Sequence, residues 1–162
     1  MPIPFVRRAS GEVAAYLEDE AATLELGARL ARGLRPGLRV YLSGQLGAGK
    51  TTLVRGCLRA LGYRGRVKSP TFSLVELYKL SSLYLYHFDF YRFEDPKEWG
   101  DAGFRDEFSG AGVCVVEWPE KAARSIPSPD LRITLEHAVT GRKAYIAGET
   151  EQGKLCLEEL VA

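Results

Sequence analysis

The sequence predicts an α/β fold built on one mixed β-sheet, in which antiparallel strands extend a parallel core. Near the front of the chain, a short apolar strand, a glycine-rich loop and a helix follow one another within residues 38–61. This succession is typical of a parallel α/β unit. Between residues 67 and 93, two segments rich in aromatic and aliphatic residues favour an antiparallel hairpin. The chain has 162 residues, and residues 1–162 are therefore expected to form a single domain.

The first predicted helix spans Asp19 to Leu34. Apolar or small residues recur there with helical spacing, at Ala21, Leu24, Ala28 and Ala31. Acidic residues at its start and arginines toward its end complement the helix dipole. A strand of sequence LRVYL at 38–42 and a helix at 51–61, which ends before Gly62, complete the front half.

The second half alternates strands with short helices. The segments FSLVELYKL and LYLYHFDFYRF predict the two strands of the hairpin. A short helix, broken by its own glycines, is expected to begin at Pro96 with Asp95 as its cap. The segment VCVV at 113–116 predicts a buried strand, and residues 119–124 predict a further helix. The segments LRITLEHAV, KAYIAGE and KLCLEEL predict up to three C-terminal strands.

The composition excludes several classes of protein. There are 22 Lys and Arg against 21 Asp and Glu, so the chain as a whole lacks the basic excess of a non-specific nucleic-acid binder. The three cysteines are widely separated, which argues against a zinc site or a disulfide framework. The sequence has neither the pattern of a signal peptide nor a membrane-length apolar run. A cytoplasmic location is expected.

The segment LSGQLGAGKTTL predicts a phosphate-binding loop at residues 44–51. Gly44, Gly49, Lys50 and Thr51 satisfy the pattern G-x-x-x-x-G-K-[ST], between a predicted strand and a predicted helix. Glycines let the backbone N–H groups converge on phosphate oxygens, and the helix N-terminus adds favourable dipole charge. Lys50 supplies a charge to the terminal phosphates, and the Thr51 hydroxyl is a ligand for Mg²⁺. With this loop, the fold class becomes a P-loop NTPase-like three-layer sandwich, with helices on both faces of the sheet.

A second group on the metal side is expected at the end of an apolar strand. Asp89 ends LYLYHFD and Glu117 ends VCVVE. Spacing alone does not show which of the two acids lies on the metal side. The alternative for either acid is that it caps the turn after its strand. Thr71, in the segment SPTF, has the position of a switch threonine near the γ-phosphate, but from the residues alone ordinary turn chemistry around Pro70 is the favoured explanation. Trp118 fits either a site wall or the core.

Four motifs make the sequence resemble a known family. The motifs GxLGAGKTT, SPTF, YHFDFYR and VEWPE occur in this order between Asp19 and Arg142, and this combination closely resembles the bacterial TsaE (YjeE) family. The resemblance implies the ATPase component of the pathway that makes threonylcarbamoyladenosine in tRNA. Gln45 and Ser73 depart from the usual residues of the motifs, with little effect expected on the site.

The resemblance also assigns roles to individual residues. Lys50 and the loop from Leu46 to Thr51 are similar to the family's ATP phosphate site, Asp89 to its hydrolytic acid, and Thr71 to its γ-phosphate sensor. Thr51, Glu117 and Asp89 resemble the metal-side residues. The full set implied for nucleotide binding is Glu20, Leu46, Gly47, Ala48, Gly49, Lys50, Thr51, Thr52, Trp118, Glu120 and Arg142.

The resemblance implies ATP and Mg²⁺ as ligands and the TsaD and TsaB proteins as partners, with tRNA engaged indirectly through the complex. Because no arginine finger is identifiable in the chain, hydrolysis is expected to be slow alone and faster with partners. The alternatives are a P-loop small-molecule kinase and a non-hydrolysing nucleotide-dependent adaptor. A regulatory GTPase is disfavoured, since the sequence has no N-K-x-D guanine motif.

Overall fold

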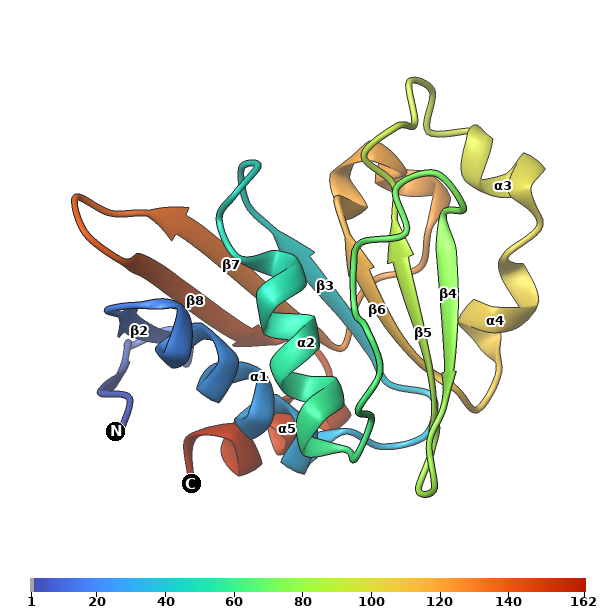
Figure 1. Cartoon of the computed structure of the whole chain (residues 1–162). Coiled ribbons are helices and arrows are strands. Elements are labelled where there is room, and N and C mark those ends of the chain that lie inside the picture. The colour runs from blue at the N-terminus through green and yellow to red at the C-terminus, as the bar shows by residue number, and fades with distance from the viewer. Residues whose placement is uncertain (1) are drawn as a thin grey trace.

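The computed structural model describes residues 2–162, and at Ala123 it describes the backbone alone. The structure is mixed α/β and contains a single eight-stranded sheet with helices packed against it (Figure 1). In chain order the strands and helices are β1 Phe5–Arg7, β2 Val13–Leu17, α1 Glu20–Gly33, β3 Arg39–Ser43, α2 Lys50–Ala60, β4 Val75–Lys79, β5 Tyr84–Asp89, α3 Glu98–Ala102, α4 Arg105–Ser109, β6 Val113–Glu117, two 3₁₀ turns at Pro119–Lys121 and Ala123–Ser125, β7 Leu131–His137, β8 Arg142–Gly148 and α5 Glu151–Val161.

The sheet has the strand order β1-β2-β8-β7-β3-β6-β5-β4. Its centre is parallel, because β3 pairs in parallel with β7 and β6, and β6 with β5. The strands added at both edges are antiparallel, as the sequence predicts for the hairpin of β4 and β5. The carboxyl ends of parallel strands meet at one edge, where open α/β sheets bind ligands.

Apolar side chains pack against both faces of the sheet. On one face α1, α2 and α5 lie together in Figure 1, and they pack with alternate strand residues such as Val40, Leu42 and Ile133. On the other face, side chains such as Tyr41 and Val116 pack with an aromatic group, which comprises Phe88, Phe90, Phe93, Trp99 and Phe108. Most of the aromatic segment that precedes the broken helix is thus used for packing, at the edge that α3 and α4 cover.

One predicted element is wrong. The segment KLCLEEL, expected to be a third C-terminal strand, lies in helix α5. Thr150 caps this helix, accepting the N–H of Gly153 at 3.1 Å. The buried positions Gly153, Cys156, Leu157 and Leu160 have the spacing of a helix rather than a strand. Leu155 and Leu157 are two residues apart, the spacing of one face of a strand, but Leu155 is 49% exposed whereas Leu157 is buried.

Other boundaries shift or were missed. Strands β1 and β2 were not predicted, because their short segments VAAYL and FVR carry little periodic signal. The helix expected from Pro96 begins instead at Glu98 and is interrupted near Gly103, giving α3 and α4. The helix expected at 119–124 is a pair of 3₁₀ turns. Since Trp118 adopts a left-handed φ of 59° just before them, no regular helix continues the chain from β6.

The three cysteines are buried and provide a chemical test of the core. Burial raises the pKa of Cys57, Cys114 and Cys156 to about 12 in each case. Because the thiolate is the reactive species, we expect native protein to react with Ellman's reagent at pH 7.5 far more slowly than unfolded protein, in which all three thiols react. Rapid reaction of even one thiol in native protein would contradict this packing.

No helix within residues 2–162 is long and apolar enough to cross a membrane.

Candidate functional site

The predicted phosphate-binding loop, residues 44–51, joins β3 to α2 at the carboxyl edge of the sheet (Figure 1). Gly44 has a φ of 153°, and a Cβ there would lie 2.6 Å from the carbonyl oxygen of Leu135. Gly49 caps α2 with a left-handed φ of 109°. These two positions require glycine, since a side chain would strain the backbone or collide with it. The loop therefore turns sharply and aims the N-terminus of an 11-residue helix outward.

Lys50, the first residue of α2, is buried beneath the loop with 5% of its surface exposed. Its ammonium group donates hydrogen bonds to the carbonyl oxygens of Gly44 and Gln45 and lies 4.1 Å from the centre of the Trp118 ring. Desolvation lowers the pKa of Lys50, against the attraction of Glu117, Glu120 and Asp89. A cation kept in such a desolvated place interacts more strongly with an anion than one in bulk water does.

Thr51 and Glu117 are in direct contact. The Thr51 hydroxyl donates to Oε2 of Glu117 at 2.9 Å and lies 3.2 Å from Oε1. The Glu117 carboxylate, at the end of β6, is 3% exposed. A threonine from the loop and an acid from a neighbouring strand thus meet, although 66 positions separate them in the sequence.

Asp89 lies directly across from Glu117, because the two residues are paired in the parallel register of β5 and β6. Oδ2 of Asp89 accepts hydrogen bonds from the hydroxyls of Ser69 and Thr71, and Oδ1 accepts the N–H of Tyr91 at 2.8 Å. The Asp89 carboxylate is buried as well, at 3% exposure. Hydrogen bonds to both of its oxygens fix its orientation.

The loop and both acids line one open cavity of about 250 Å³. Its walls bring together most of the residues that the sequence singled out, namely Leu46, Gly47, Ala48, Gly49, Lys50, Thr51, Thr52, Thr71, Asp89, Glu117 and Trp118, and they add Ser69 and Tyr91. Trp118 contributes to this wall, with its ring 5.0 Å from that of Tyr91. Trp118 also packs against the aromatic core, so it combines the two positions that the sequence left open.

Three sequence-predicted residues lie outside this lining. Arg142 is beside it, since its guanidinium donates to the carbonyl oxygen of Gly47 at 3.1 Å. The carboxylate of Glu120 accepts from Ser43 at 3.3 Å and borders a separate surface hollow. Glu20 is exposed in the first turn of α1. Thr23, one turn farther along, lies against the Gly49 position. The start of α1 is therefore adjacent to the loop, but no cavity-lining contact involves Glu20.

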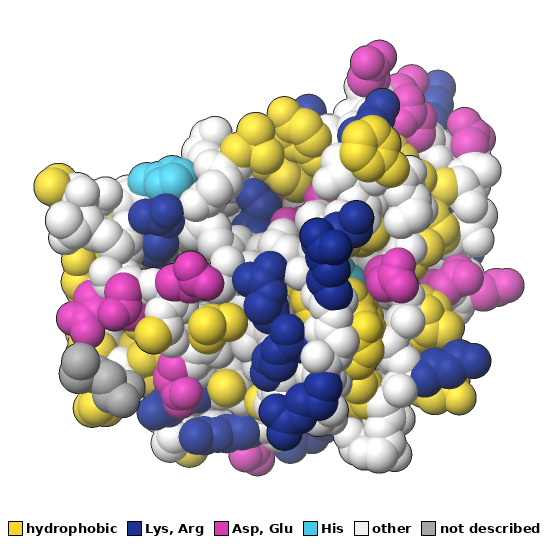
Figure 2. All heavy atoms as spheres, in the orientation of Figure 1, with side chains coloured by type: hydrophobic (Ala, Val, Ile, Leu, Met, Phe, Trp, Pro, Cys, Tyr) yellow, Lys and Arg dark blue, Asp and Glu magenta, His cyan; other side chains and the backbone are white. Residues whose placement is uncertain are grey.

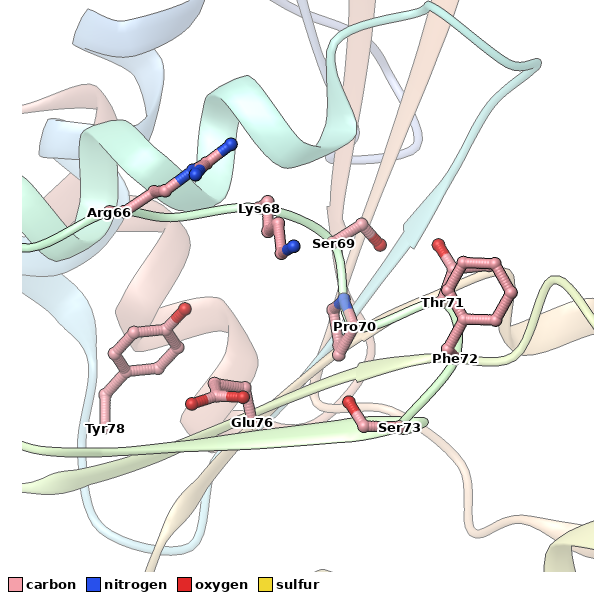
Figure 3. Close-up of a pocket in the computed structure, with 9 residues that line it drawn as sticks. All are labelled: Arg66, Lys68, Ser69, Pro70, Thr71, Phe72, Ser73, Glu76 and Tyr78. Carbon is pink, nitrogen blue, oxygen red and sulfur yellow. The ribbon is translucent and has the colours of Figure 1, made fainter.

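A larger pocket of about 470 Å³ adjoins the cavity on the side of Ser69 and Thr71 (Figure 3). In Figure 3 the hydroxyls of both residues point away from this pocket, while the aromatic ring of Tyr78 and the carboxylate of Glu76 lie on its opposite side. Ser69 and Thr71 line both spaces, whereas Phe72 lines the larger pocket and is 86% exposed. The SPTF segment therefore forms a partition, with its hydroxyls bonded to Asp89 and its phenylalanine presented to solvent.

The charges of the chain are unevenly distributed. Residues 51–75 contain five basic and no acidic residues, namely Arg55, Arg59, Arg64, Arg66 and Lys68. Figure 2 shows Lys and Arg side chains gathered on this face of the molecule, over α2 and the segment after it. The near-neutral composition therefore excludes a basic excess of the whole chain, but not a local one.

The residues present fit a nucleotide with a bound Mg²⁺. Within the described part of the chain, no group of three or more His, Cys, Asp or Glu residues could hold a metal by itself. Mg²⁺ prefers oxygen ligands and is held in nucleotide sites by one or two protein groups, phosphate oxygens and water. The Thr51 hydroxyl and the Glu117 carboxylate offer such hard oxygen donors beside the loop.

Several contacts around these acids were not predicted from the sequence. Nε2 of His87 lies 2.7 Å from Oε2 of Glu117, and His137 approaches the carbonyl oxygen of Leu46 at 3.2 Å. Ser69, which donates to Asp89, was not predicted as its partner either. One signal was present, because His87 and Asp89 are two apart in a predicted strand and so share a face of the sheet.

Comparison with known proteins agrees with the motifs. A model of the family described as "Threonylcarbamoyl adenosine biosynthesis protein TsaE" matches residues 17–144. The tRNA threonylcarbamoyladenosine biosynthesis protein TsaE of Haemophilus influenzae is 40% identical over 144 residues, which cover 86% of this chain and 91% of that protein. The protein of the same name from Bacillus subtilis is 40% identical over 121 residues, covering 75% of this chain and 73% of that protein.

A solved structure extends the likeness to the whole fold. The crystal structure of YdiB from Bacillus subtilis matches with a TM-score of 0.77 and 27% identity, over 99% of this chain and 96% of that chain. The family match spans the loop, Asp89 and Glu117, and relatives at 40% identity cover most of their own length. The chain belongs to the TsaE family.

Proposed function

We propose that the cavity between the loop and the two acids binds ATP with Mg²⁺ and hydrolyses it, in a P-loop NTPase-like domain. The observation that carries this proposal is the convergence of Lys50, Thr51, Asp89 and Glu117 on one cavity at the carboxyl edge of the sheet. A phosphate loop alone would serve binding, whereas the added pair of buried carboxylates supplies the groups that hydrolysis requires.

Each residue has a distinct part in the proposed reaction. The loop amides and Lys50 bind the phosphates, and the Lys50 ammonium offsets the negative charge that develops on the γ-phosphoryl group. Thr51 and Glu117 would hold Mg²⁺, which when bound neutralises charge between the β- and γ-phosphates. Asp89 orients the attacking water by accepting a hydrogen bond from it. Thr71, bonded to Asp89 at 3.2 Å, links the SPTF segment to the site and would sense the γ-phosphate.

We further infer that hydrolysis supports the formation of threonylcarbamoyladenosine in tRNA. The names of the relatives support this role. The chain would act in the cytoplasm with the TsaD and TsaB proteins and would meet tRNA through that complex. Lys50 is the one cation among the described residues that line the cavity, and no arginine is among them. A second positive group of the arginine-finger kind would therefore have to come from outside the cavity, and turnover by the isolated chain is expected to be slow.

ATP hydrolysis with and without the two partners tests this proposal. We expect the chain alone to release phosphate slowly, and the complex to release it at least about 10-fold faster. Lys50→Ala should abolish both activities, because it removes the charge buried beneath the loop. Lys68→Ala, a change of the same kind at an exposed lysine outside the cavity, should leave the activity of the isolated chain unchanged. Transfer of phosphate to a metabolite instead of water would favour a kinase, and equal rates with and without partners would contradict the proposed coupling.

A further inference from the structure

His87 lies in the sheet, on the strand between β6 and the edge strand β4, and its side chain contacts one of the two acids of the site. It belongs to β5, two residues before Asp89, and its side chain is fully buried, with 0% of its surface exposed. Its Nε2 is 2.7 Å from Oε2 of Glu117. The proposed reaction as described above assigns no part to this side chain.

Glu117 is contacted from two sides. Thr51 approaches it from helix α2, and His87 approaches it from the neighbouring strand β5. Both hydrogen bonds reach Oε2, while Oε1 contacts Thr51 alone, at 3.2 Å. Because a buried carboxylate needs hydrogen-bond donors to remain charged and oriented, these two donors together determine how Glu117 faces the cavity.

The second ring nitrogen of His87, Nδ1, indicates that the contact with Glu117, rather than packing, explains why a histidine occupies this position. Nδ1 is buried and has no hydrogen-bond partner within residues 2–162. Leaving a buried polar atom unpaired is unfavourable. Packing alone would be served better by an apolar side chain, such as Leu85 or Phe88 on the same strand. An ionised carboxylate only accepts hydrogen bonds, so a hydrogen bond to it at this distance requires the tautomer of His87 that carries a proton on Nε2.

We propose that His87 is a positioning residue, which holds the Glu117 carboxylate in the orientation that meets Thr51 and the nucleotide-bound divalent cation. This inference rests on the proposed function. Groups that orient metal ligands typically change metal affinity by about 10–100-fold when they are removed. Within residues 2–162 no hydrogen bond joins the His87 side chain to the loop or to Lys50, so we expect nucleotide binding without metal not to depend on it.

Two polar substitutions separate positioning from packing. His87→Gln places an amide N–H near the position of Nε2, and His87→Asn places it near that of Nδ1, one bond too short to reach Glu117. His87→Met removes the donor and fills the space. The measurements are Mn²⁺ affinity in the presence of ADP by electron paramagnetic resonance, ADP affinity in EDTA, and thermal unfolding, all with the full chain.

We expect His87→Asn and His87→Met to weaken Mn²⁺ binding in the ADP complex by about 10–100-fold. His87→Gln should keep the Mn²⁺ affinity within about 3-fold of wild type, because its amide N–H can still donate to Glu117 and orient that ligand. In all three, ADP affinity in EDTA should be unchanged. Equal Mn²⁺ affinity in the Gln and Asn variants, whatever their melting temperatures, would overturn the proposal. A wild-type chain that binds ADP without any effect of Mn²⁺ contradicts the proposed function itself, whereas wild-type metal binding that His87→Asn leaves intact contradicts only the role of His87.

Discussion

Asp89→Asn should lower the rate of ATP hydrolysis by roughly 100-fold or more, while ATP still binds. The substitution keeps the shape of the side chain and removes its negative charge. The amide oxygen can still accept the N–H of Tyr91, and the new amide N–H₂ can donate to the hydroxyls of Ser69 and Thr71. The variant should therefore fold, with the loop and Lys50 undisturbed. Single-turnover hydrolysis, nucleotide affinity and thermal unfolding measure the three parts of this expectation.

Asp95→Asn is the matched control for this variant. Asp95 is exposed, and its carboxylate accepts the N–H of Lys97 at 2.9 Å, outside the cavity. The same chemical change there should leave hydrolysis at the wild-type rate. If Asp89→Asn hydrolysed ATP normally while Glu117→Gln did not, the water-orienting role would belong to Glu117. If Asp89→Asn in cells supported tRNA modification as well as wild type, hydrolysis would be dispensable and the chain would act as a nucleotide-dependent adaptor.

Gly56→Ala should destabilise the folded protein by about 3 kcal/mol, at the upper end of the typical cost of overpacking. Helices α1 and α2 approach closely, and a Cβ on Gly56 would lie 2.1 Å from the carbonyl oxygen of Leu24. Gly27 has the reciprocal position, 2.1 Å from the carbonyl oxygen of Leu53. Because backbone atoms cannot move aside as a flexible side chain can, the two helices must separate. The melting temperature should fall by roughly 6–12 °C.

Gly100→Ala controls for the substitution itself. Gly100 is also helical, in α3, but its nearest neighbour for a new Cβ is a flexible guanidinium atom of Arg105 at 4.0 Å. Alanine there should be neutral or stabilising by up to about 1 kcal/mol, since alanine favours helices over glycine. Equal melting temperatures for Gly56→Ala and Gly100→Ala would show that α1 and α2 are not in such close contact. A fall in stability of Gly56→Ala should also weaken nucleotide binding, because α2 carries Lys50 and Thr51.

Much of the parallel centre of the fold was predictable from the sequence. The strand before the loop, the helix after it and the strand before Glu117 were each predicted within about two residues of the observed boundaries, as expected for strongly patterned segments. The two hairpin strands were predicted as strands, but the segments 72–80 and 83–93 extend up to four residues beyond Val75–Lys79 and Tyr84–Asp89. The errors fall where local patterns are weak. The segment KLCLEEL alternates enough to resemble a strand, yet its neighbours Thr150 and Gly153 begin a helix. Strands β1 and β2 are short, and they join the sheet through a long-range pairing: β1 pairs with β2, and β2 pairs with β8, which follows more than a hundred residues later.

The sequence by itself determined the residue types of the candidate site, because a phosphate-binding loop needs glycines, a lysine and a threonine at one short spacing, and these are present at residues 44–51. It also named Asp89 and Glu117 as the acids that end apolar strands. Only the tertiary structure decided how these groups meet. Parallel pairing of β5 with β6 sets Asp89 opposite Glu117, and packing of α2 on the sheet brings Thr51 to Glu117. The hydrogen bond from His87 and the exclusion of Glu120 from the cavity depend on the same strand order. Such contacts join residues far apart in the chain, and no local pattern encodes them, because they arise from which strands become neighbours.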